Sequence, residues 1–325
     1  MPGAAMAPDP LWTPIIGHYD EARLDRARIQ AHVAQLRPYV RQFLIGGTTG
    51  DGWQLDQALL GQWLDLIADP GLFDADHVVL VGAFGATTDE VIERARFIEE
   101  RLDARPAAAT FAGLTLCPPV DADASQDAIA RHFEAVLAAT SSPVAIYQLP
   151  QVTGCEIAPR TFAHLAAAQP RIRYFKDTSG EDRVAWAGLP TNGVRLLRGA
   201  EGHYAQQLRP AGPYHGWLLS TGNGLASELR EIADLTAQGR MEQARCLSDR
   251  LAALVAELFA LATPFGGNAF ADANRAADHL QAYGPAWASA PPPRRLDGSL
   301  LPFDLIAGAE RALNAAGIRP ACYLA

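Results

Sequence analysis

Several features that define other classes of protein are missing from this chain of 325 residues. No apolar run approaches the roughly 18 residues that a membrane helix needs. The N-terminal stretch MPGAAMAPDP has neither a basic segment nor an apolar core, so the sequence predicts no signal peptide. The four cysteines are scattered, which indicates neither a disulfide framework nor a zinc knuckle. We therefore expect a cytoplasmic protein.

Positive charge and metal-binding motifs are also scarce. The formal net charge of −9 argues against a nucleic-acid or anionic-membrane partner. Eight histidines are present, but none stands in an H-x-H or H-E-x-x-H motif, so the sequence predicts no catalytic metal. His203 lies near the seventh candidate strand, and His215 precedes the eighth and belongs at the far end of the fold. The glycine-rich segment GGTTG lacks both the Walker lysine and the Rossmann spacing.

What the chain does have is a short apolar run followed by a helical segment, repeated eight times. The candidate strands are residues 11–16, 43–50, 77–84, 113–119, 144–150, 172–179, 194–200 and 216–221. Between strands, residues 27–36, 88–102 and 125–140 show the apolar period of an amphipathic helix. Buried strands that alternate with helices predict a parallel sheet covered on its outer face. Eight units favour a closed (β/α)₈ TIM barrel, with an open sheet as the alternative because periodicity does not detect closure.

The pattern changes after the eighth strand. Residues 225–239 complete the eighth unit, and long helical stretches then follow without a strand between them. These stretches are residues 241–262, 271–284 and 303–317, the last ending on a glycine. The sequence therefore predicts a barrel domain over residues 1–238 and a C-terminal helical appendage over residues 239–325.

Lys176 stands inside the sixth candidate strand and follows bulky residues. Period-2 alternation places its side chain on the same face as Ile172, Tyr174 and Thr178. A lysine that faces inward at the end of a buried strand is desolvated, which disfavours its charged form. The neutral amine can then attack a carbonyl and form a Schiff base. The alternative is a lysine whose stem packs while its ammonium reaches water.

Other strand ends carry small, hydroxylic or ionisable residues, and functional groups of such a barrel gather at the carboxyl ends of its strands. These ends are residues 46–50, 147–154, 199–201 and 220–223. The GGTTG turn offers consecutive backbone N–H groups and the hydroxyls of Thr48 and Thr49, which suit a carboxylate. Asp177 has the opposite strand parity to Lys176, so we expect it to be structural and to pair outside the barrel.

Three motifs, GGTTGDG, YQLPQVTG and YFKDTSG, resemble in order and spacing the dihydrodipicolinate synthase / N-acetylneuraminate lyase family of class I aldolases. The similarity runs from LWTPII to STGN and continues weakly into the C-terminal helices. Each motif alone is a weak signal, but the three together are specific. The resemblance implies a (β/α)₈ barrel, a lysine Schiff base with a 2-keto acid such as pyruvate, no other cofactor, and a homo-oligomer, either a tetramer or a dimer.

The resemblance also assigns roles to residues of this chain. Lys176 matches the lysine that forms the Schiff base, and Tyr147 matches the tyrosine that shuttles the proton. The G-T-T-G turn, here Thr48, Thr49 and Gly50, binds the carboxylate of the keto acid, and Thr48 counts among the catalytic residues. In the lyase branch, residues matching Thr178, Gly199, Glu201 and Ser220 contact the hydroxylated tail of the substrate.

Two departures from the family pattern bear on the substrate and the mechanism. The synthase branch has an arginine that clamps a second carboxylate where this chain has Val152, so the chain resembles the lyase branch more closely. Many members carry a tyrosine after the fourth strand that completes a proton relay. Residues 118–122, PPVDA, supply none here.

The sequence thus favours a class I aldolase or lyase that cleaves or forms a C–C bond between pyruvate and an aldehyde, with a 2-keto-3-deoxy sugar acid as the expected type of substrate. A dehydratase of 2-keto-3-deoxy sugar acids that uses the same lysine is one alternative. A barrel that binds 2-keto acids without catalysis is another, because the relay tyrosine is missing. The presence of both Lys176 and Tyr147 weighs against that last alternative.

Overall fold

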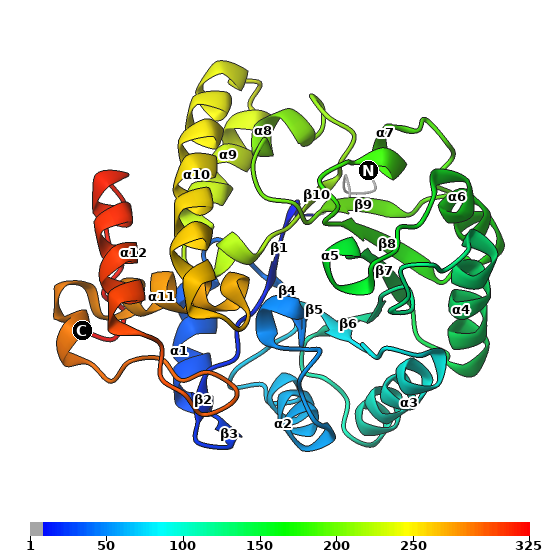
Figure 1. Cartoon of the computed structure of the whole chain (residues 1–325), viewed down its shortest axis with the longest axis horizontal. Helices are drawn as coiled ribbons and strands as arrows, with labels where there is room; N and C mark the ends of the chain where they lie inside the picture. The colour runs from blue at the N-terminus through cyan, green and yellow to red at the C-terminus, as the bar shows by residue number, and fades with distance from the viewer. Residues whose placement is uncertain (1–8) are drawn as a thin grey trace, which may run out of the picture.

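The structure is a computed structural model that describes residues 9–325. Residues 1–8, and with them most of the stretch for which no signal peptide is expected, lie outside the described residues. Eight parallel strands close into a barrel in the order β1-β10-β9-β8-β7-β6-β5-β4 (Figure 1). The strands are β1 (Leu11–Pro14), β4 (Gln42–Ile45), β5 (Val78–Gly82), β6 (Thr110–Leu116), β7 (Val144–Gln148), β8 (Ile172–Asp177), β9 (Arg195–Arg198) and β10 (Gly216–Leu218). The predicted TIM barrel is confirmed, and the open sheet is excluded.

Several strands end earlier than the sequence pattern predicts, because turns begin inside the predicted segments. Short helices follow three of them: η1 (Thr48–Gly50), α5 (Pro150–Thr153) and η2 (Ser220–Asn223). Gly46 has a φ of +58°, a conformation that favours glycine and turns the chain out of β4. Pro150 occupies the first turn of α5, where its missing N–H costs nothing.

Helices cover the outside of the barrel (Figure 1). They are α1 (Arg26–Leu36), α2 (Gln57–Ile67), α3 (Thr88–Ala104), α4 (Gln126–Ala139), α6 (Pro159–Ala168), α7 (Arg183–Trp186), α8 (Tyr204–Gln207) and α9 (Ala226–Ala237). Local chemistry sets several of their starts: Asp56 caps α2, and Thr87 with Glu90 forms a capping box on α3. A small hairpin of β2 (Tyr19–Asp20) and β3 (Arg23–Leu24) was not predicted, because two-residue strands leave no periodic signal.

Two apolar layers hold the barrel together. The inner layer is a cluster with one residue from each of six strands: Trp12, Leu44, Leu80, Ala145, Leu197 and Leu218. A far larger cluster fills the space between the strands and the helices. Burial of these side chains supplies the main driving force for folding, at roughly 25 cal/mol per Å² of apolar surface.

One detail of the predicted strand faces is wrong. Tyr174 packs with the inner cluster, whereas Ile172 belongs to the outer one. The register between β7 and β8 shifts after Val144, so that Val144 pairs with Ile172 and Ala145 pairs with Tyr174. The extra residue, Arg173, is a bulge, and a bulge reverses the facing of the residues before it.

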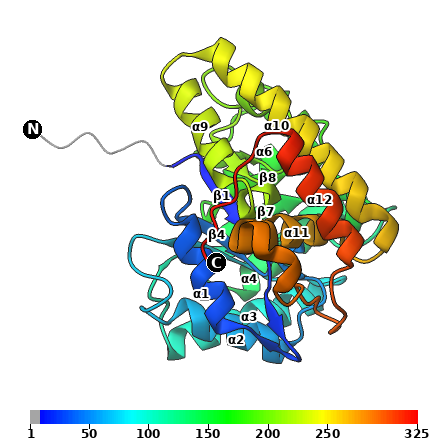
Figure 2. The same ribbon diagram turned by 90° about the vertical axis from the view of Figure 1, so that its left-hand side faces the viewer.

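The C-terminal helices pack together on one side of the barrel (Figures 1 and 2). They are α10 (Met241–Ala262), η3 (Thr263–Phe265), α11 (Ala269–Tyr283), η4 (Gly284–Ser289) and α12 (Phe303–Ala315). Helix α11 contacts both η1 and η2 at the carboxyl ends of β4 and β10. The division into domains at residue 238 stays a prediction. Among the described residues, no helix has the length and apolarity that a bilayer crossing requires.

Candidate active site

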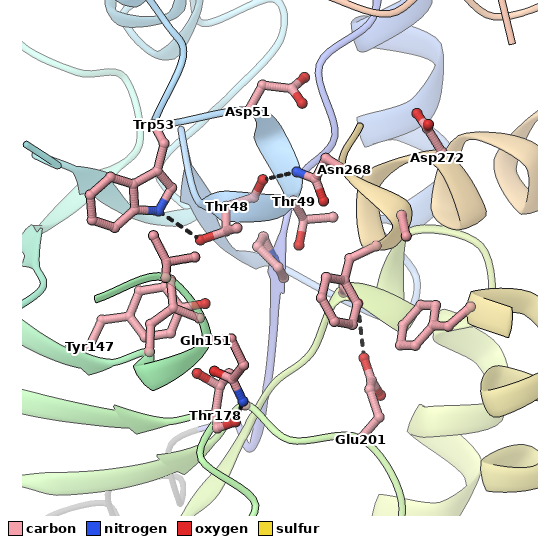
Figure 3. A pocket seen from close by; sticks show the side chains of 18 of the residues that line it. Thr48, Thr49, Asp51, Trp53, Tyr147, Gln151, Thr178, Glu201, Asn268 and Asp272 are labelled. Atoms are coloured by element: carbon pink, nitrogen blue, oxygen red, sulfur yellow. Dashed lines mark hydrogen bonds between the residues drawn. The ribbon is translucent and has the colours of Figure 1, made fainter. Parts of the chain in front are cut away.

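A cavity of about 1040 Å³ opens at the carboxyl ends of the strands (Figure 3). Eight of the predicted site residues line it: Thr48, Thr49, Tyr147, Lys176, Thr178, Gly199, Glu201 and Ser220. Gly50 is the exception among the predicted residues. It packs against the chain just after β1, where a Cβ atom would lie 2.5 Å from the Ile15 carbonyl oxygen, so glycine is needed there for space.

Lys176 is the only lysine of the chain, a compositional signal that the motif-based reasoning left unused. Its side chain projects from β8 into the barrel and is 4% exposed. Burial lowers the pKa of its amine to about 7, although Cys117 and Glu201 act in the opposite direction. A substantial fraction of the amine is therefore neutral near pH 7, the form that attacks a carbonyl.

Gly199, at the end of β9, makes room for this lysine. A Cβ atom there would lie 2.7 Å from Lys176 Cε and 2.4 Å from Thr178 Cγ2. Both distances are far below van der Waals contact, so any larger residue would displace the reactive side chain. The predicted site residue Gly199 thus has a clear packing role beside Lys176.

Tyr147 is the immediate neighbour of Lys176 across the β7–β8 pair. The Lys176 Nζ atom lies 3.9 Å from the centroid of the Tyr147 ring. Burial raises the pKa of the Tyr147 hydroxyl well above its ordinary value, with Cys117 adding to the effect and the Thr48 and Thr178 hydroxyls opposing it. The tyrosine consequently carries its proton in the free protein and is ready to act as an acid.

The predicted anion-binding turn uses two of its amides internally and directs its threonine side chains to the cavity. The N–H groups of Gly50 and Gly52 both donate to the Gly47 carbonyl at 2.9 Å, so they hold the turn together. The side chains of Thr48 and Thr49 line the cavity. The two threonine hydroxyls of this turn are thus placed where a ligand would bind, while the amides of Gly50 and Gly52 are engaged.

Two residues that the sequence reasoning missed position Thr48 (Figure 3). Trp53 Nε1 donates to Thr48 Oγ1 at 3.2 Å. Asn268 Nδ2 donates to the Thr48 carbonyl at 2.6 Å, while Asn268 Oδ1 caps α11 by accepting from the Ala271 N–H at 3.2 Å. The motif GGTTGDGW already contains Trp53, but no local pattern connects residue 268 to residue 48.

Glu201 and its neighbours form a closed hydrogen-bonded group at the opposite side of the cavity. Its carboxylate accepts from Ser220 Oγ at 2.9 Å, Tyr204 OH at 3.0 Å and the Thr221 N–H at 3.2 Å. Burial raises the pKa of Glu201, and these hydrogen bonds oppose the rise. Thr178 Oγ1 likewise donates to the Gln148 carbonyl at 2.6 Å. These predicted substrate contacts are therefore largely engaged with the protein itself.

Asp177 lies on the outer side of the strand, as its parity predicts. Its Oδ1 atom accepts from the N–H of Ser179 at 2.9 Å and from Ser179 Oγ at 2.6 Å. Burial raises the pKa of this carboxyl group. The aspartate does not line the cavity, which agrees with a structural role in the turn after β8.

Residues 118–122, which lack the expected tyrosine, stay outside the cavity lining. The Val120 N–H donates to the Ala86 carbonyl at 3.0 Å, and the Asp121 N–H donates to the Thr153 carbonyl at 3.0 Å. This loop is thus tied to the turns after β5 and β7. The Thr48 hydroxyl oxygen instead accepts from the Trp53 indole.

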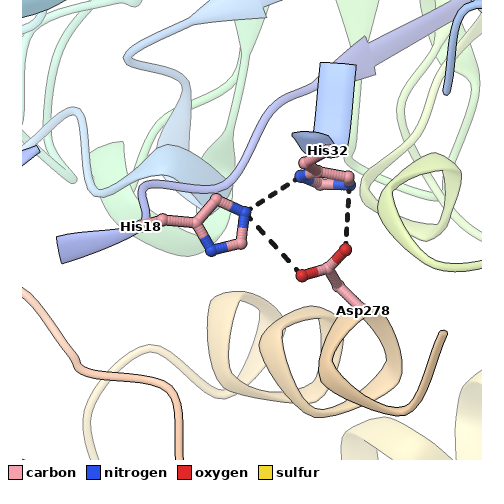
Figure 4. A group of neighbouring side chains, drawn as sticks. All are labelled: His18, His32 and Asp278. Atoms are coloured by element: carbon pink, nitrogen blue, oxygen red, sulfur yellow. Dashed lines mark hydrogen bonds and ion pairs between the residues drawn. The ribbon is translucent and has the colours of Figure 1, made fainter. Parts of the chain in front are cut away.

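Within residues 9–325, one group of three potential metal ligands lies together: His18, His32 and Asp278 (Figure 4). His18 Nε2 lies 3.0 Å from His32 Nδ1, and His32 Nε2 lies 2.9 Å from the Asn223 carbonyl oxygen. Asp278 forms an ion pair with Arg28. Burial and the Arg28 charge lower the pKa of both histidines. Because its donors and acceptors satisfy one another, we interpret this cluster as the polar contact that joins α1 to α11.

Comparison with known proteins decides the family. The sequence model of the Dihydrodipicolinate synthetase family matches residues 16–272, which is most of the chain. The chain belongs to this family. The resemblance that the three motifs indicate is therefore confirmed, and the match extends into α11.

Individual relatives are distant from this member of the dihydrodipicolinate synthetase family. A 4-hydroxy-tetrahydrodipicolinate synthase of Escherichia coli O139:H28 is 29% identical over 141 residues, which cover 43% of this chain and 48% of the relative. The chain thus matches about half of that relative's length.

Two solved structures share the fold over almost the whole chain. YagE, a prophage protein from E. coli K12 in complex with pyruvate, has a TM-score of 0.74 and 20% identity, covering 94% of this chain and 98% of its own. A variant of Sulfolobus solfataricus 2-keto-3-deoxygluconate aldolase in complex with L-2-keto, 3-deoxy-galactonate has a TM-score of 0.73 and 17% identity. It covers 94% of this chain and 95% of its own.

Proposed function

We propose that the protein is a class I aldolase, a carbon–carbon lyase that acts on a 2-keto acid through a Schiff base on Lys176. Pyruvate is the keto-acid half, and an aldehyde is the other half. The observation that carries the proposal is the buried Lys176 amine, with its pKa lowered to about 7, directly beside Tyr147. Membership of the family and the pyruvate complex of YagE support it.

The residues of the cavity account for each step of the reaction. Lys176 Nζ adds to the keto carbon, and the resulting carbinolamine loses water as Tyr147 gives its proton to the departing hydroxyl. The iminium then withdraws the electron pair of the C3–C4 bond, while the tyrosinate takes the proton of the C4 hydroxyl and the aldehyde leaves. Tyr147 then gives this proton to C3, and hydrolysis by water releases pyruvate and restores Lys176. No external cofactor enters this sequence of steps.

The threonine turn completes the pyruvate end of the site. In the proposed complex, Thr48 and Thr49 donate their hydroxyls to the carboxylate of the keto acid and so fix the keto carbon near Lys176. Trp53 and Asn268 hold Thr48 in place from either side. Thr48 would therefore combine substrate binding with a position next to the proton-transferring tyrosine.

The other end of the substrate is less closely defined. A 2-keto-3-deoxy sugar acid as substrate stays a prediction from the resemblance. The side chains predicted to contact its hydroxylated tail, Thr178, Glu201 and Ser220, are already hydrogen-bonded within the protein. Val152 lines the cavity with an apolar, 38% exposed side chain. An apolar residue does not compensate a desolvated carboxylate, so we expect poor turnover of pyruvate with aspartate semialdehyde. Efficient turnover of that pair would contradict this assignment.

Trapping with borohydride tests the proposal. Incubation with pyruvate and borohydride is expected to attach one pyruvate-derived group, which mass spectrometry should locate on Lys176. The experiment is unusually clean because the only other primary amine of the chain is its N-terminus. The matched control is Lys176→Met, which should acquire no group. Absence of an adduct in the wild type, or an adduct only at the N-terminus, would favour a non-catalytic barrel.

A further inference from the structure

The cavity walls beyond Lys176 carry aromatic side chains from two separate parts of the chain. On one side, Trp53 stacks on Phe84, with ring centroids 5.0 Å apart and an angle of 19° between the planes. On the C-terminal side, Phe259 from α10 and Phe270 from α11 pack edge to face with centroids 4.9 Å apart. Trp53, Phe259 and Phe270 all line the cavity. Two separate parts of the chain thus contribute aromatic surface to one space.

Aliphatic side chains extend these walls. Leu149 and Val152 follow β7, and Leu296 comes from the loop between η4 and α12. Phe270 is 48% exposed, which is unusual for so large an apolar side chain. Covering exposed apolar surface with an apolar ligand is favourable by roughly 25 cal/mol per Å². This part of the cavity is therefore suited to an apolar group.

The charged residues of the same region are occupied with one another. Arg275 is paired with both Asp51 and Asp272. Asp272 also pairs with Arg295 at 2.7 Å. Two carboxylates and two guanidiniums compensate each other, so this network offers no net charge to a charged substrate tail.

Part of the Arg295 guanidinium remains available in this region. The Nε atom of Arg295 is buried without a hydrogen-bond partner and its residue lines the cavity. A single N–H of this kind suits one hydroxyl or ether substituent on a ring. Each hydroxyl in the row carried by a sugar acid needs a partner when it leaves water, and this N–H supplies one of them.

We infer that the aldehyde half of the substrate is aromatic, or of similar apolar bulk, and that it binds between Trp53 and the Phe259–Phe270 pair. This inference rests on the proposed aldolase function. The corresponding reaction is the retro-aldol cleavage of a 4-aryl-4-hydroxy-2-keto acid. Its C3–C4 bond breaks, the electron pair passes into the Lys176 iminium, and the proton of the C4 hydroxyl passes to Tyr147. The aromatic aldehyde leaves, Tyr147 gives the proton to C3 of the resulting enamine, and hydrolysis of the iminium by water releases pyruvate.

The test compares two substrates that share the reacting end and differ in the tail. These are 4-hydroxy-2-oxo-4-phenylbutanoate and 2-keto-3-deoxygluconate, and pyruvate release is measured for both. We expect kcat/KM to be at least about tenfold higher for the phenyl compound, since differences of one or a few apolar groups are worth about 10–200-fold. Borohydride trapping with pyruvate is run in parallel.

A pair of variants distinguishes the loss of an aromatic contact with the substrate from a general effect of the substitution on activity. Phe270→Ser is expected to lower kcat/KM for the phenyl compound about tenfold, because it removes one aromatic face. Phe303→Ser is the matched control: Phe303 is 60% exposed on α12 and does not line the cavity. It should leave the kcat/KM of both substrates unchanged.

The outcomes distinguish this inference from the proposed function. If trapping labels Lys176 but the sugar acid is cleaved as well as the phenyl compound, or neither is cleaved, the inference is wrong and the Schiff base stands. An unchanged kcat/KM in Phe270→Ser would also overturn it. If trapping itself fails, the proposed function is wrong, and the inference falls with it.

Discussion

At the scale of single residues, the site depends on an amine held where its charged form is disfavoured. Lys176 is buried inside the barrel, and its pKa is lowered from 10.5 to about 7. The neutral form of the amine and the free-energy cost of burying it have the same cause, because both follow from desolvation. Rate and stability should therefore both respond to pH through this one residue.

The first prediction concerns that pH dependence. Between about pH 7 and 10.5 the unfolded chain binds more protons at Lys176 than the folded chain, so this lysine makes the free energy of unfolding rise with pH. Lys176→Met lacks this contribution. Unfolding by urea at about pH 7 and pH 9.5 should show the variant to be the more stable protein, with the difference shrinking at the higher pH. If the difference in free energy of unfolding between the variant and the wild type were equal at the two pH values, Lys176 would not be desolvated as described.

The second prediction concerns Tyr147. Tyr147→Phe removes the hydroxyl that exchanges protons but keeps the buried ring, so turnover should fall by roughly 10²–10⁴-fold. Borohydride trapping with pyruvate should weaken less, because attack by Lys176 also depends on its own desolvation and on the carboxylate site. Tyr174→Phe is the matched control, since Tyr174 also lies inside the barrel but away from the cavity lining. Near-native turnover of Tyr147→Phe would assign the shuttle to another group, with Asp121 or a bound water as the next candidates.

At the scale of secondary-structure elements, the start of α11 links the C-terminal helices to the turn that carries Thr48. Asn268 caps α11 with one side-chain atom and holds the Thr48 carbonyl with the other. The side chain of Asn268 thus contributes both to the start of the helix and to the position of Thr48. Its two contributions can be separated by substitution.

The third prediction uses that separation. Asn268→Ala should lower the free energy of unfolding by about 1 kcal/mol through loss of the cap. It should also raise the pyruvate concentration needed for half-maximal trapping several-fold, since a hydrogen bond contributes about 0.5–1.5 kcal/mol. Asn268→Ser keeps a capping hydroxyl but is too short to reach Thr48. This variant should recover the stability without recovering the affinity for pyruvate. Recovery of both would show that Asn268 acts only as the cap of α11.

At the scale of the whole molecule, buried polar contacts join the barrel to the C-terminal helices. The cluster of His18, His32 and Asp278 lies between the barrel and α11, and Arg275 pairs with Asp51 of the turn after β4. Removing one partner of such a buried pair is costly, because the other is left uncompensated. The C-terminal helices are thus part of the wall of the site. The homo-oligomer implied by the resemblance stays a prediction.

The fourth prediction follows from the polar cluster. Its histidines are bonded to each other and to a carbonyl group, and Arg28 neutralises Asp278, so the donor set is unsuited to a cation. Treatment with EDTA should leave both turnover and the melting temperature unchanged. Loss of either, restored by a divalent cation, would show that this cluster or another site holds a metal.

The sequence was sufficient for the barrel and for the gathering of the candidate site residues around one cavity, because both leave local signals. Buried parallel strands give continuous apolar runs, and glycine and hydroxyl residues mark where each run ends. The carboxyl ends of barrel strands meet at one face, so the sequence could predict that Lys176, Tyr147 and Thr48 lie close together. The predicted strands extend too far along the chain where short helices begin inside the apolar run. The bulge at Arg173 was missed, since one extra residue leaves no mark on the periodicity.

Only the tertiary structure decided what surrounds these site residues. Asn268 reaches Thr48 across 220 residues, and Phe259 and Phe270 enter the cavity from helices whose sequence indicates only that they are amphipathic. The structure likewise showed that Glu201 is already bonded to Ser220 and Tyr204. The physical reason is the same in each case. A periodic pattern determines which face of an element is buried, but packing between distant elements determines which side chains meet there and which polar groups remain free for a ligand.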